Sequence, residues 1–399
     1  MKKLLKILLL GFVVLAILGS IAKNKKLKEG KELAGPEEKI TPTENTGSTA
    51  GTKPVEVTLS KPLQKILISG DDPKSGYADA SLEYSPDGTG WLAYSRAHFA
   101  SAAKRYVETH IAKSSDKGAT WQYVATANTS NDHVVNGKFA GVWRNETPSL
   151  VYDPSDEADK RWKLYYQRYL AVPLRPHAYT ENIIAYKYAP SPAGPWSEEV
   201  CVLGAKSNCA QTPGDMHSSL KNMIFFNELG TLSLKGRLYM SADMSPSDTG
   251  VGTSRDLQNR KMVLLSSSSH GKNWQYAGVL TNYSDATNLG YVTFTASSLV
   301  QKNGQPYLLI SPSGSIQGKN KAHDGSYLAK FTDIESAKLL RDGKGNISFL
   351  QIIKPALARG GQSDYDSQNT AGGIIFSQLN AGDSSQPFQI FNTFRGILE

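Results

Sequence analysis

The stretch Ser114 to Trp121 constrains the fold of this chain more than any other. It reads Ser-Ser-Asp-Lys-Gly-Ala-Thr-Trp, a tight turn between two strands. Asp116 can accept hydrogen bonds from turn amides, Gly118 can adopt a positive φ, and Trp121 can pack between two sheets. A second copy, Ser267 to Trp274, keeps the Gly and the Trp but replaces the Asp by Ser and the Thr by Asn. The recurrence predicts a repeated sheet architecture.

The chain from about residue 57 onward is predicted to be all-β. Short runs of Val, Ile, Tyr, Trp and Thr alternate with Gly, Pro, Asn and Asp turns, and no long amphipathic helix stands out. Five segments share a layout of a small residue with an aliphatic one, a polar turn and an aromatic returning strand. They begin at Ser81, Ser149, Thr231, Ser298 and Gly373.

Five copies predict a five-bladed β-propeller. Outer hairpins are expected at 107–123, 183–196, 262–276 and 327–340, but the fifth copy has none before the chain ends at Glu399. The leftover segment 57–69 is therefore expected to supply the missing outer strand of the last blade. Such closure would remove an exposed sheet edge.

The N-terminus is predicted to direct export. Three lysines precede an uncharged run from Ile7 to Ala22, which reads as a signal peptide or a membrane anchor, residues 1–22, with the span at 4–22. Four lysines follow at once, as at a stop-transfer border, so cleavage stays open. Residues 23–56 lack aromatics and read as a flexible linker. The propeller domain is placed at 57–399, in the periplasm or outside the cell, with membrane contact only through the N-terminal segment.

The charge pattern argues against nucleic acid as a partner. The formal net charge is +8, but residues 1–60 carry ten Lys and six Glu, a charge of +4. The remaining 339 residues hold 34 basic and 30 acidic residues, which is also +4 and nearly balanced. No basic stripe with interleaved aromatics stands out.

The only two cysteines, Cys201 and Cys209, are eight residues apart. They could close a short loop as a disulfide, which would suit an extracytoplasmic location, or they could be two unrelated thiols. No His or Cys partner lies at zinc-ligand spacing, so no metal site is expected from them.

These motifs carry a family resemblance. The pattern S-x-D-x-G-x-T-W resembles the Asp-box of sialidases and related propellers. Five repeats, a Ser-Pro-Ala-Gly-Pro-Trp hairpin at 191–196 and acids just ahead of the inner strands resemble the five-bladed propeller glycosidases, the arabinanase, xylosidase and invertase-like group. The resemblance covers residues 57–399 as architecture and is confined in detail to short motifs.

In that group three carboxylates lie on inner strands at the mouth of the central channel. The resemblance implies that Asp79 is the general base, Glu146 the pKa-modulating acid and Glu228 the general acid. Hydrolysis needs one protonated and one ionised carboxyl, and converging like charges push one pKa upward. Asp79 lies two residues before its strand start and the two glutamates lie three before theirs, so strand alternation would separate them unless a bulge intervenes. The same acids could instead satisfy turn amides at strand ends.

Further polar residues flank these acids. Tyr77 and Arg144 neighbour two of them, and His217 lies in the long insertion between the second and third repeats, so all three are candidates for binding sugar hydroxyls or a substrate carboxylate. His217 could equally be a solvated loop side chain. Asp243 and Asp366 could be further pocket acids, but their positions are more typical of turn residues.

The predicted function is an exported glycoside hydrolase acting on extracytoplasmic glycans, with carbohydrate as partner and a monomeric state. One alternative is a sialidase-like exo-glycosidase, for which Arg96, Arg144 and Arg168 could be offered as a carboxylate-binding set. Another is a propeller that binds glycan or protein without turnover. No organic cofactor is implied; the resemblance allows a channel-bound Ca²⁺, although no loop has regular Ca²⁺-ligand spacing.

Overall fold

The computed structural model describes residues 55–58, 64–101, 103–173, 179–205, 209–247, 254–314, 323–354, 360–368, 373–379, 386–393 and 396–397. The predicted segment 1–22 and nearly all of the linker 23–56 lie outside the described residues. Within the described ranges, no helix is long and apolar enough to cross a membrane.

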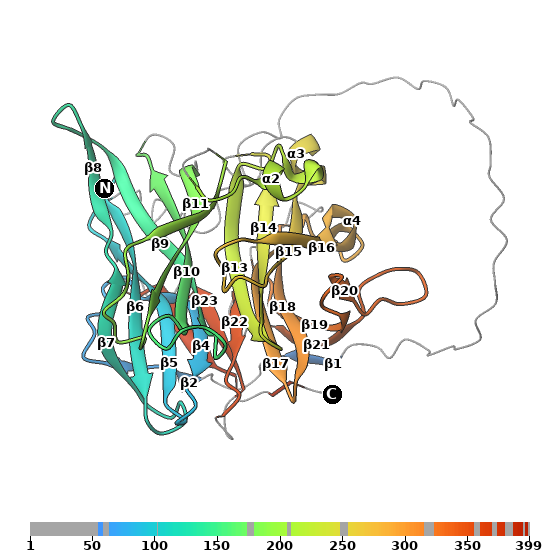
Figure 1. Cartoon of the computed structure of the whole chain (residues 1–399), viewed down its shortest axis with the longest axis horizontal. Coiled ribbons are helices and arrows are strands. Elements are labelled where there is room, and N and C mark those ends of the chain that lie inside the picture. Colours follow the sequence, from blue (N-terminus) through green and yellow to red (C-terminus); the bar gives the residue numbers. More distant parts are fainter. Residues whose placement is uncertain are drawn as a thin grey trace, which may run out of the picture.

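The described residues form five antiparallel blades (Figure 1). The innermost strands of these blades contact one another in a closed ring. Blade 1 contains β4 (Tyr77–Tyr84), β5 (Gly90–Phe99), β6 (Arg105–Ser114) and β7 (Trp121–Asn128); blade 2 contains β9 (Lys138–Tyr152), β10 (Trp162–Ala171), β11 (Tyr179–Ala189) and β12 (Val200–Gly204); blade 3 contains β13 (Phe225–Leu234), β14 (Arg237–Ser245), β15 (Lys261–Ser267) and β16 (Gln275–Asn282). Blade 4 contains β17 (Thr293–Lys302), β18 (Gln305–Ser313), β19 (Ser326–Asp333) and β21 (Phe349–Lys354), and blade 5 contains β22 (Gly360–Tyr365), β23 (Ile374–Leu379) and β24 (Phe388–Asn392). The ring runs β4, β9, β13, β17, β22 and back to β4. The all-β, five-bladed prediction is confirmed.

Smaller elements decorate the blades. Strand β8 (Asn131–Val135) forms a hairpin with β9 that extends beyond the other strands in Figure 1, and β20 (Lys338–Leu339) branches from β19. Helices α2 (Pro213–Met216) and α3 (Ser254–Asn259) lie at the same end of the molecule as that hairpin (Figure 1), with α4 (Tyr283–Thr287) nearby. The 3₁₀ turn η1 (Ser218–Leu220) follows α2.

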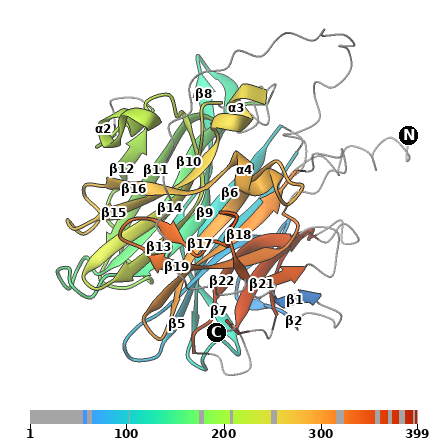
Figure 2. The same ribbon diagram turned by 90° about the vertical axis from the view of Figure 1, so that its right-hand side faces the viewer.

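The N-terminal strands close the ring. Strand β2 (Gln64–Lys65) pairs antiparallel with β24 and becomes the outer strand of blade 5, which confirms the predicted closure. The same segment does more than predicted, because β1 (Val55–Thr58) pairs in parallel with β21 of blade 4 and β3 (Ile68–Ser69) with β7 of blade 1. Figure 2 shows blue β1 and β2 beside the red C-terminal strands. The N-terminal segment therefore joins three blades.

The two turn motifs have the geometry that their sequences predict. Asp116 accepts hydrogen bonds from the amide of Thr120 at 2.9 Å and from its hydroxyl at 2.6 Å, and Gly118 has a φ of 80°. Trp121 is buried among Ile375 and Ile390 of blade 5. In the second motif, Trp274 packs edge-on against Tyr165 of blade 2, with ring centroids 5.7 Å apart. Each motif thus drives an indole between neighbouring blades.

The fifth repeat was assigned to the wrong strands of its blade. Its predicted inner strand, starting at Gly373, is the second strand β23, and the true inner strand is β22. Strand β22 reads Gly-Gly-Gln-Ser-Asp-Tyr and has no apolar alternation, because it is buried on both sides among neighbouring inner strands. As a result Asp366 follows the inner strand instead of preceding it.

Candidate functional site

Every inner strand carries a β-bulge at the same register. The pairing with the second strand shifts near this point in each blade, and one residue there adopts a left-handed backbone conformation. These five residues are Asp79, Thr147, Glu228, Ala296 and Gln362, with φ between 46° and 55°. Such a conformation is unfavourable for residues other than Gly and persists where neighbouring groups enforce it.

Serine side chains of the preceding blade hold three of the bulges in place. The amide of Asp79 donates to Ser377 Oγ at 3.0 Å, and the amide of Thr147 donates to Ser95 Oγ at 3.1 Å. The amide of Gln362 donates to Ser311 Oγ at 3.2 Å. We call this second-strand serine the interblade latch. It fixes the bulge of one blade to the sheet of the blade before it.

In blades 2 and 3, the two blades whose latch positions lie nearest Glu228, the residue at the latch position is not serine. Register places Gln167 opposite Glu146 in blade 2 and Asp243 opposite Asn227 in blade 3, where the other blades have serine. The amide of Ala296 donates instead to Glu228 Oε2, at 2.6 Å. The regular framework is therefore altered around one carboxylate.

The bulge also explains how residues with different offsets can reach one site. Asp79 and Glu228 both occupy the left-handed bulge position, whereas Glu146 immediately precedes the bulge residue Thr147. The predicted conflict of strand alternation is thus removed, because the bulge changes the direction of successive side chains. All three acids are half-buried.

Asp79 lies at the electrostatic centre of the set. Its carboxylate accepts hydrogen bonds from the Ser95 hydroxyl and from the Thr147 amide, which oppose the upward shift that burial gives its pKa. Its charge raises the pKa values of both Glu146 and Glu228. The structure therefore brings the three predicted acids within interaction range of one another.

Glu146 is held by a tyrosine and an arginine. The Tyr169 hydroxyl donates to Glu146 Oε1, and Arg144 donates to the same hydroxyl at 3.2 Å. Burial first and Asp79 second raise the pKa of Glu146 to about 7, although the Arg144 guanidinium opposes the shift. Arg144 itself is buried and also donates from Nε to the carbonyl of Arg105 at 2.7 Å.

The pKa of Glu228 is raised further than that of Glu146. Burial and then the neighbouring charges of Asp243 and Asp79 raise its pKa to about 8. His323 Nε2 lies 3.8 Å from Glu228 Oε1. A carboxyl with this pKa is protonated at neutral pH and can donate a proton to a leaving group.

Two predicted binding residues do not belong to this site. Tyr77 is only 5% exposed and packs edge-on against Tyr94 in the core between blades 5 and 1, so its ring is a core side chain. His217 caps η1 by accepting from the Ser219 amide, and its ring lies 4.6 Å from that of Tyr276 on the outermost strand of blade 3. Neither prediction fits the structure, because alternation and loop position alone did not fix where these rings point.

Around these acids lie side chains that the sequence analysis did not assign to the site. Asp243, expected in a turn, lies within β14 with no exposed surface and forms a bidentate pair with Arg260. Tyr169 and His323 contact Glu146 and Glu228 as described above. The spacing of Asp243 and Arg260 gives no signal, since the pair forms across a long connection between β14 and β15. Asp366 accepts from the Tyr84 hydroxyl at 2.7 Å and is a buried structural acid.

Two of the three arginines considered for a sialidase, Arg96 and Arg168, form ion pairs within their own blades. Arg96 pairs with Glu108 at 2.9 Å in blade 1, and Arg168 pairs with Glu199 at 2.7 Å in blade 2. Arg168 also stacks on the Trp143 ring, 4.5 Å from its centroid. In these ion pairs the guanidinium groups already bind a carboxylate of the protein, whereas a sialidase arginine would bind the carboxylate of the substrate.

One group of side chains has metal-ligand types close together. Asp153, Asp156 and His270 have ligand atoms within 4.8 Å of one another. However, the buried ammonium of Lys163 lies 2.6 Å from Asp156 and 3.7 Å from Asp153. This ammonium supplies the positive charge that the two carboxylates require, so we interpret the group as a structural ion-pair cluster.

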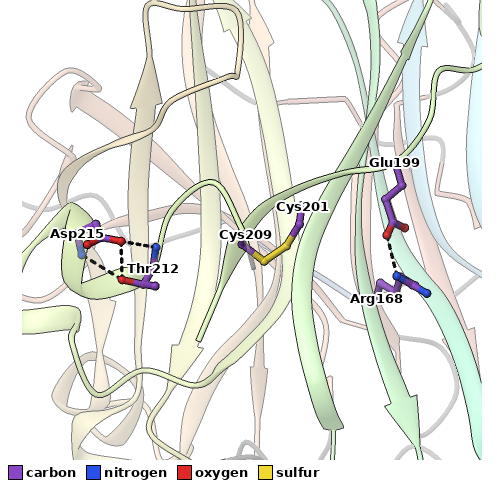
Figure 3. Close-up of a disulfide and its surroundings, with 6 residues drawn as sticks. All are labelled: Arg168, Glu199, Cys201, Cys209, Thr212 and Asp215. Atoms are coloured by element: carbon purple, nitrogen blue, oxygen red, sulfur yellow. Dashed lines mark hydrogen bonds and ion pairs between the residues drawn. A yellow bond between two sulfur atoms is a disulfide. The ribbon is translucent and has the colours of Figure 1, made fainter. Parts of the chain in front are cut away.

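Cys201 and Cys209 form a disulfide, with Cα atoms 4.8 Å apart. Figure 3 shows that it joins β12 to the segment leading to α2, whose Thr212 and Asp215 form a capping box. In the same view Arg168 and Glu199 lie on neighbouring parts of blade 2. The disulfide thus anchors the long connection between blades 2 and 3.

Comparisons with known proteins support the fold. No protein-family model matches the chain, and no curated protein matches it by sequence. An exo-β-1,3-galactanase from Clostridium thermocellum superposes with a TM-score of 0.51 at 13% identity, covering 82% of this chain and 60% of that one. A family 32 β-fructofuranosidase variant from Bombyx mori, in complex with sucrose, gives 0.50 at 12% identity, covering 83% and 62%. The chain thus spans less than two thirds of either relative. The resemblance to five-bladed propeller glycosidases is confirmed as a fold.

Proposed function

We propose that this chain is a glycoside hydrolase whose catalytic carboxylates are Asp79, Glu146 and Glu228. The observation that carries the proposal is that Asp79 couples electrostatically to both glutamates from the innermost strands of three consecutive blades. A protein that only binds neutral sugars gains nothing from three interacting half-buried acids, because their mutual repulsion costs stability.

The protonation of these groups suits acid–base hydrolysis of a glycosidic bond. Glu228, with a pKa of about 8, stays protonated at neutral pH and can donate to the departing oxygen. Burial raises the pKa of Asp79 overall, and two hydrogen bonds favour its anion, the form that can accept a proton from the attacking water. Glu146, with a pKa of about 7, completes the set. We assign Glu228 as general acid, Asp79 as general base and Glu146 as an auxiliary acid beside the base.

The proposed substrate is a carbohydrate outside the cytoplasm. The apolar run within residues 1–22 and the Cys201–Cys209 disulfide support an exported location, since disulfides persist in oxidising compartments. The fold relatives described above act on galactan and fructoside bonds, by the names they carry. We propose a monomer that reaches its glycan through one mouth of the propeller, held to the membrane if the N-terminal segment is retained.

Release of reducing sugar from arabinan, xylan, galactan, fructan and sialylated glycans tests this function. The full chain should hydrolyse at least one of them, and Glu228→Gln should lose most of that activity while remaining folded. Glu83→Gln provides a matched control, because Glu83 is also a glutamate of raised pKa, about 8, that is not one of the three. Binding of a glycan with no turnover by the intact chain would instead identify a lectin-like propeller.

A further inference from the structure

We propose that Asp243 is the residue that keeps Glu228 protonated, a role that the family resemblance assigned to Glu146. This inference rests on the proposed function, in which Glu228 is the general acid. Asp243 touches no reacting atom in this account and is a positioning residue that acts through Glu228.

The two carboxylates are held side by side by consecutive residues of β17. Glu228 Oε2 accepts the Ala296 amide at 2.6 Å, and Asp243 accepts the hydroxyl of the preceding residue, Thr295. In blade 3, Asp243 is also the register partner of Asn227, the residue before Glu228. Three strands, β13, β14 and β17, therefore fix Asp243 next to Glu228.

Further hydrogen bonds connect the backbone of Glu228 to the strand that carries Asp243. Ser297 Oγ donates to the Glu228 carbonyl at 2.8 Å, and Ser241 Oγ donates to Ser297 Oγ at 2.9 Å. Asp243 and Ser241 both have no exposed surface. The Glu228 backbone and the strand that carries Asp243 are thus tied into one buried network.

Arg260 favours the ionised form of Asp243. Its Nε lies 2.9 Å from Oδ1 and 3.1 Å from Oδ2, and its second guanidinium nitrogen also donates to Oδ2. Burial raises the pKa of Asp243 overall, and Arg260 and Thr295 oppose that shift in favour of the anion. With Asp243 ionised, a second charge on Glu228 is disfavoured, as in other carboxylate pairs.

The charges that shift the pKa of Glu228 include Asp243 and not Glu146. After burial, Asp243 is the largest cause of the raised pKa of Glu228, followed by Asp79, while Arg260 acts in the opposite direction. His323 faces the other carboxylate oxygen of Glu228. Glu146, by contrast, is shifted by Asp79 and Arg144. The modulating charge thus comes from the blade of the acid itself.

The sequence position of Asp243 is consistent with a special role. In blades 1, 4 and 5 the equivalent residue is the latch serine, Ser95, Ser311 or Ser377, which binds the next bulge. An aspartate in this place leaves the Ala296 amide to Glu228 and adds a buried charge. Replacing a neutral latch by a charged group costs desolvation energy, which a purely structural position has no reason to include.

The Asp243→Asn variant of the full chain tests this inference without a substrate. Glutamate labelled with ¹³C at Cδ reports the titration of each carboxyl by NMR, and Glu228→Gln assigns the Glu228 resonance. We expect Asp243→Asn to lower the Glu228 midpoint by at least about one pH unit. If an active substrate has been found, the alkaline limb of its pH–rate profile should move by the same amount.

Matched variants keep the test decisive. Asp285→Asn removes another buried aspartate, which lies in α4 and pairs with Arg341, and it should leave the Glu228 midpoint unchanged. Should Asp243→Asn not fold because Arg260 loses this buried carboxylate, the double variant Asp243→Asn with Arg260→Gln removes both charges. The Glu228 midpoint of the double variant should lie between those of the single variant and the wild type.

The inference is overturned if the Glu228 midpoint stays within about 0.3 pH units of wild type in the folded Asp243 variant, well below the shift a close charge produces. It is also overturned if Glu146→Gln, and not the Asp243 variant, lowers that midpoint. Failure of the proposed function would appear differently, as absence of glycan hydrolysis with the titration shift still present.

Discussion

A half-buried glutamate outside the proposed site makes the stability of this propeller depend on pH. Glu83, on β4 of blade 1, accepts hydrogen bonds from the amides of Tyr84 and, across the blade boundary, Tyr152. Burial first, and then the charge of Asp364 on β22, raise its pKa to about 8. Because three inner strands meet at this carboxyl, its ionisation should weaken the ring as a whole.

The sign and size follow from linkage. The folded-state pKa lies above the ordinary value of 4.5, so the stabilising contribution is complete below pH 4.5 and is lost as pH rises toward 8. At pH 7 the unfolded chain has released this proton and the folded chain has not. The free energy of unfolding is therefore lower than at pH 4.5 by about 3 kcal/mol, at 1.36 kcal/mol per pH unit. Glu83→Gln cannot ionise and still offers an oxygen to the amides, so it should recover this energy. For a domain of this size the gain is about 4 °C in Tm.

Thermal unfolding of the wild type and Glu83→Gln at pH 5, 6, 7 and 8 measures the effect. The two Tm values should nearly coincide at pH 5 and separate steadily as pH rises, with the variant more stable. Glu335→Gln changes an exposed glutamate and should follow the wild type throughout. Parallel curves for wild type and Glu83→Gln would refute the argument.

Two further predictions concern the site and its support. Tyr169→Phe removes the hydroxyl that donates to Glu146, so the pKa of Glu146 should rise above about 7. Tyr166→Phe removes a hydroxyl that donates to Glu199 and should leave the pKa of Glu146 unchanged. ¹³C titration of the glutamates measures both pKa changes, and equal effects of the two variants would contradict the assignment. Replacing Cys201 and Cys209 by serine should cost about 2.5 kcal/mol by the chain-entropy estimate for a short loop, seen as a lower denaturant midpoint; an unchanged midpoint would show that the loop is held without the disulfide.

The parts of the fold that the sequence predicted are those with local chemical signatures. Asp116, Gly118 and Trp121 identified a turn whose hydrogen bonds and backbone angles are all local. Ring closure by the N-terminal segment followed from counting strands, since a blade without an outer strand would leave an open edge. The sequence could not predict that the N-terminal segment pairs with three different blades, because β2 and β3 are two-residue strands with no periodicity.

The parts that the sequence did not predict depend on long-range packing. Strand β22 is polar and looks like a loop, yet the neighbouring inner strands bury it. The left-handed backbone at Asp79 is held by a latch bond to Ser377 of another blade, and that at Glu228 is accompanied by a hydrogen bond from Ser297 of the next blade to the Glu228 carbonyl. Residue type alone does not predict such a conformation for Asp or Glu.

The same limit applied to the site. Asp79, Glu146 and Glu228 are predicted as site residues because acids before inner strands are visible in the sequence, and Asp79 interacts electrostatically with both glutamates in the structure. Asp243 was set aside because nothing in its neighbourhood marks it, and its partner Arg260 becomes adjacent only when β14 and β15 pair. Tyr77 was selected for its proximity to Asp79, but it is a core residue.

The leaving-group dependence of hydrolysis tests the central claim, that Glu228 is the acid and Asp79 the base, most directly. Aryl glycosides of the sugar that the intact chain accepts would be compared with its natural linkage. A nitrophenolate needs no proton to depart, so Glu228→Gln should retain most activity on the aryl glycoside and lose it on the natural linkage, whereas Asp79→Asn should lose both. Equal losses on both substrates in both variants, or full activity in either variant on the natural linkage, would contradict the account.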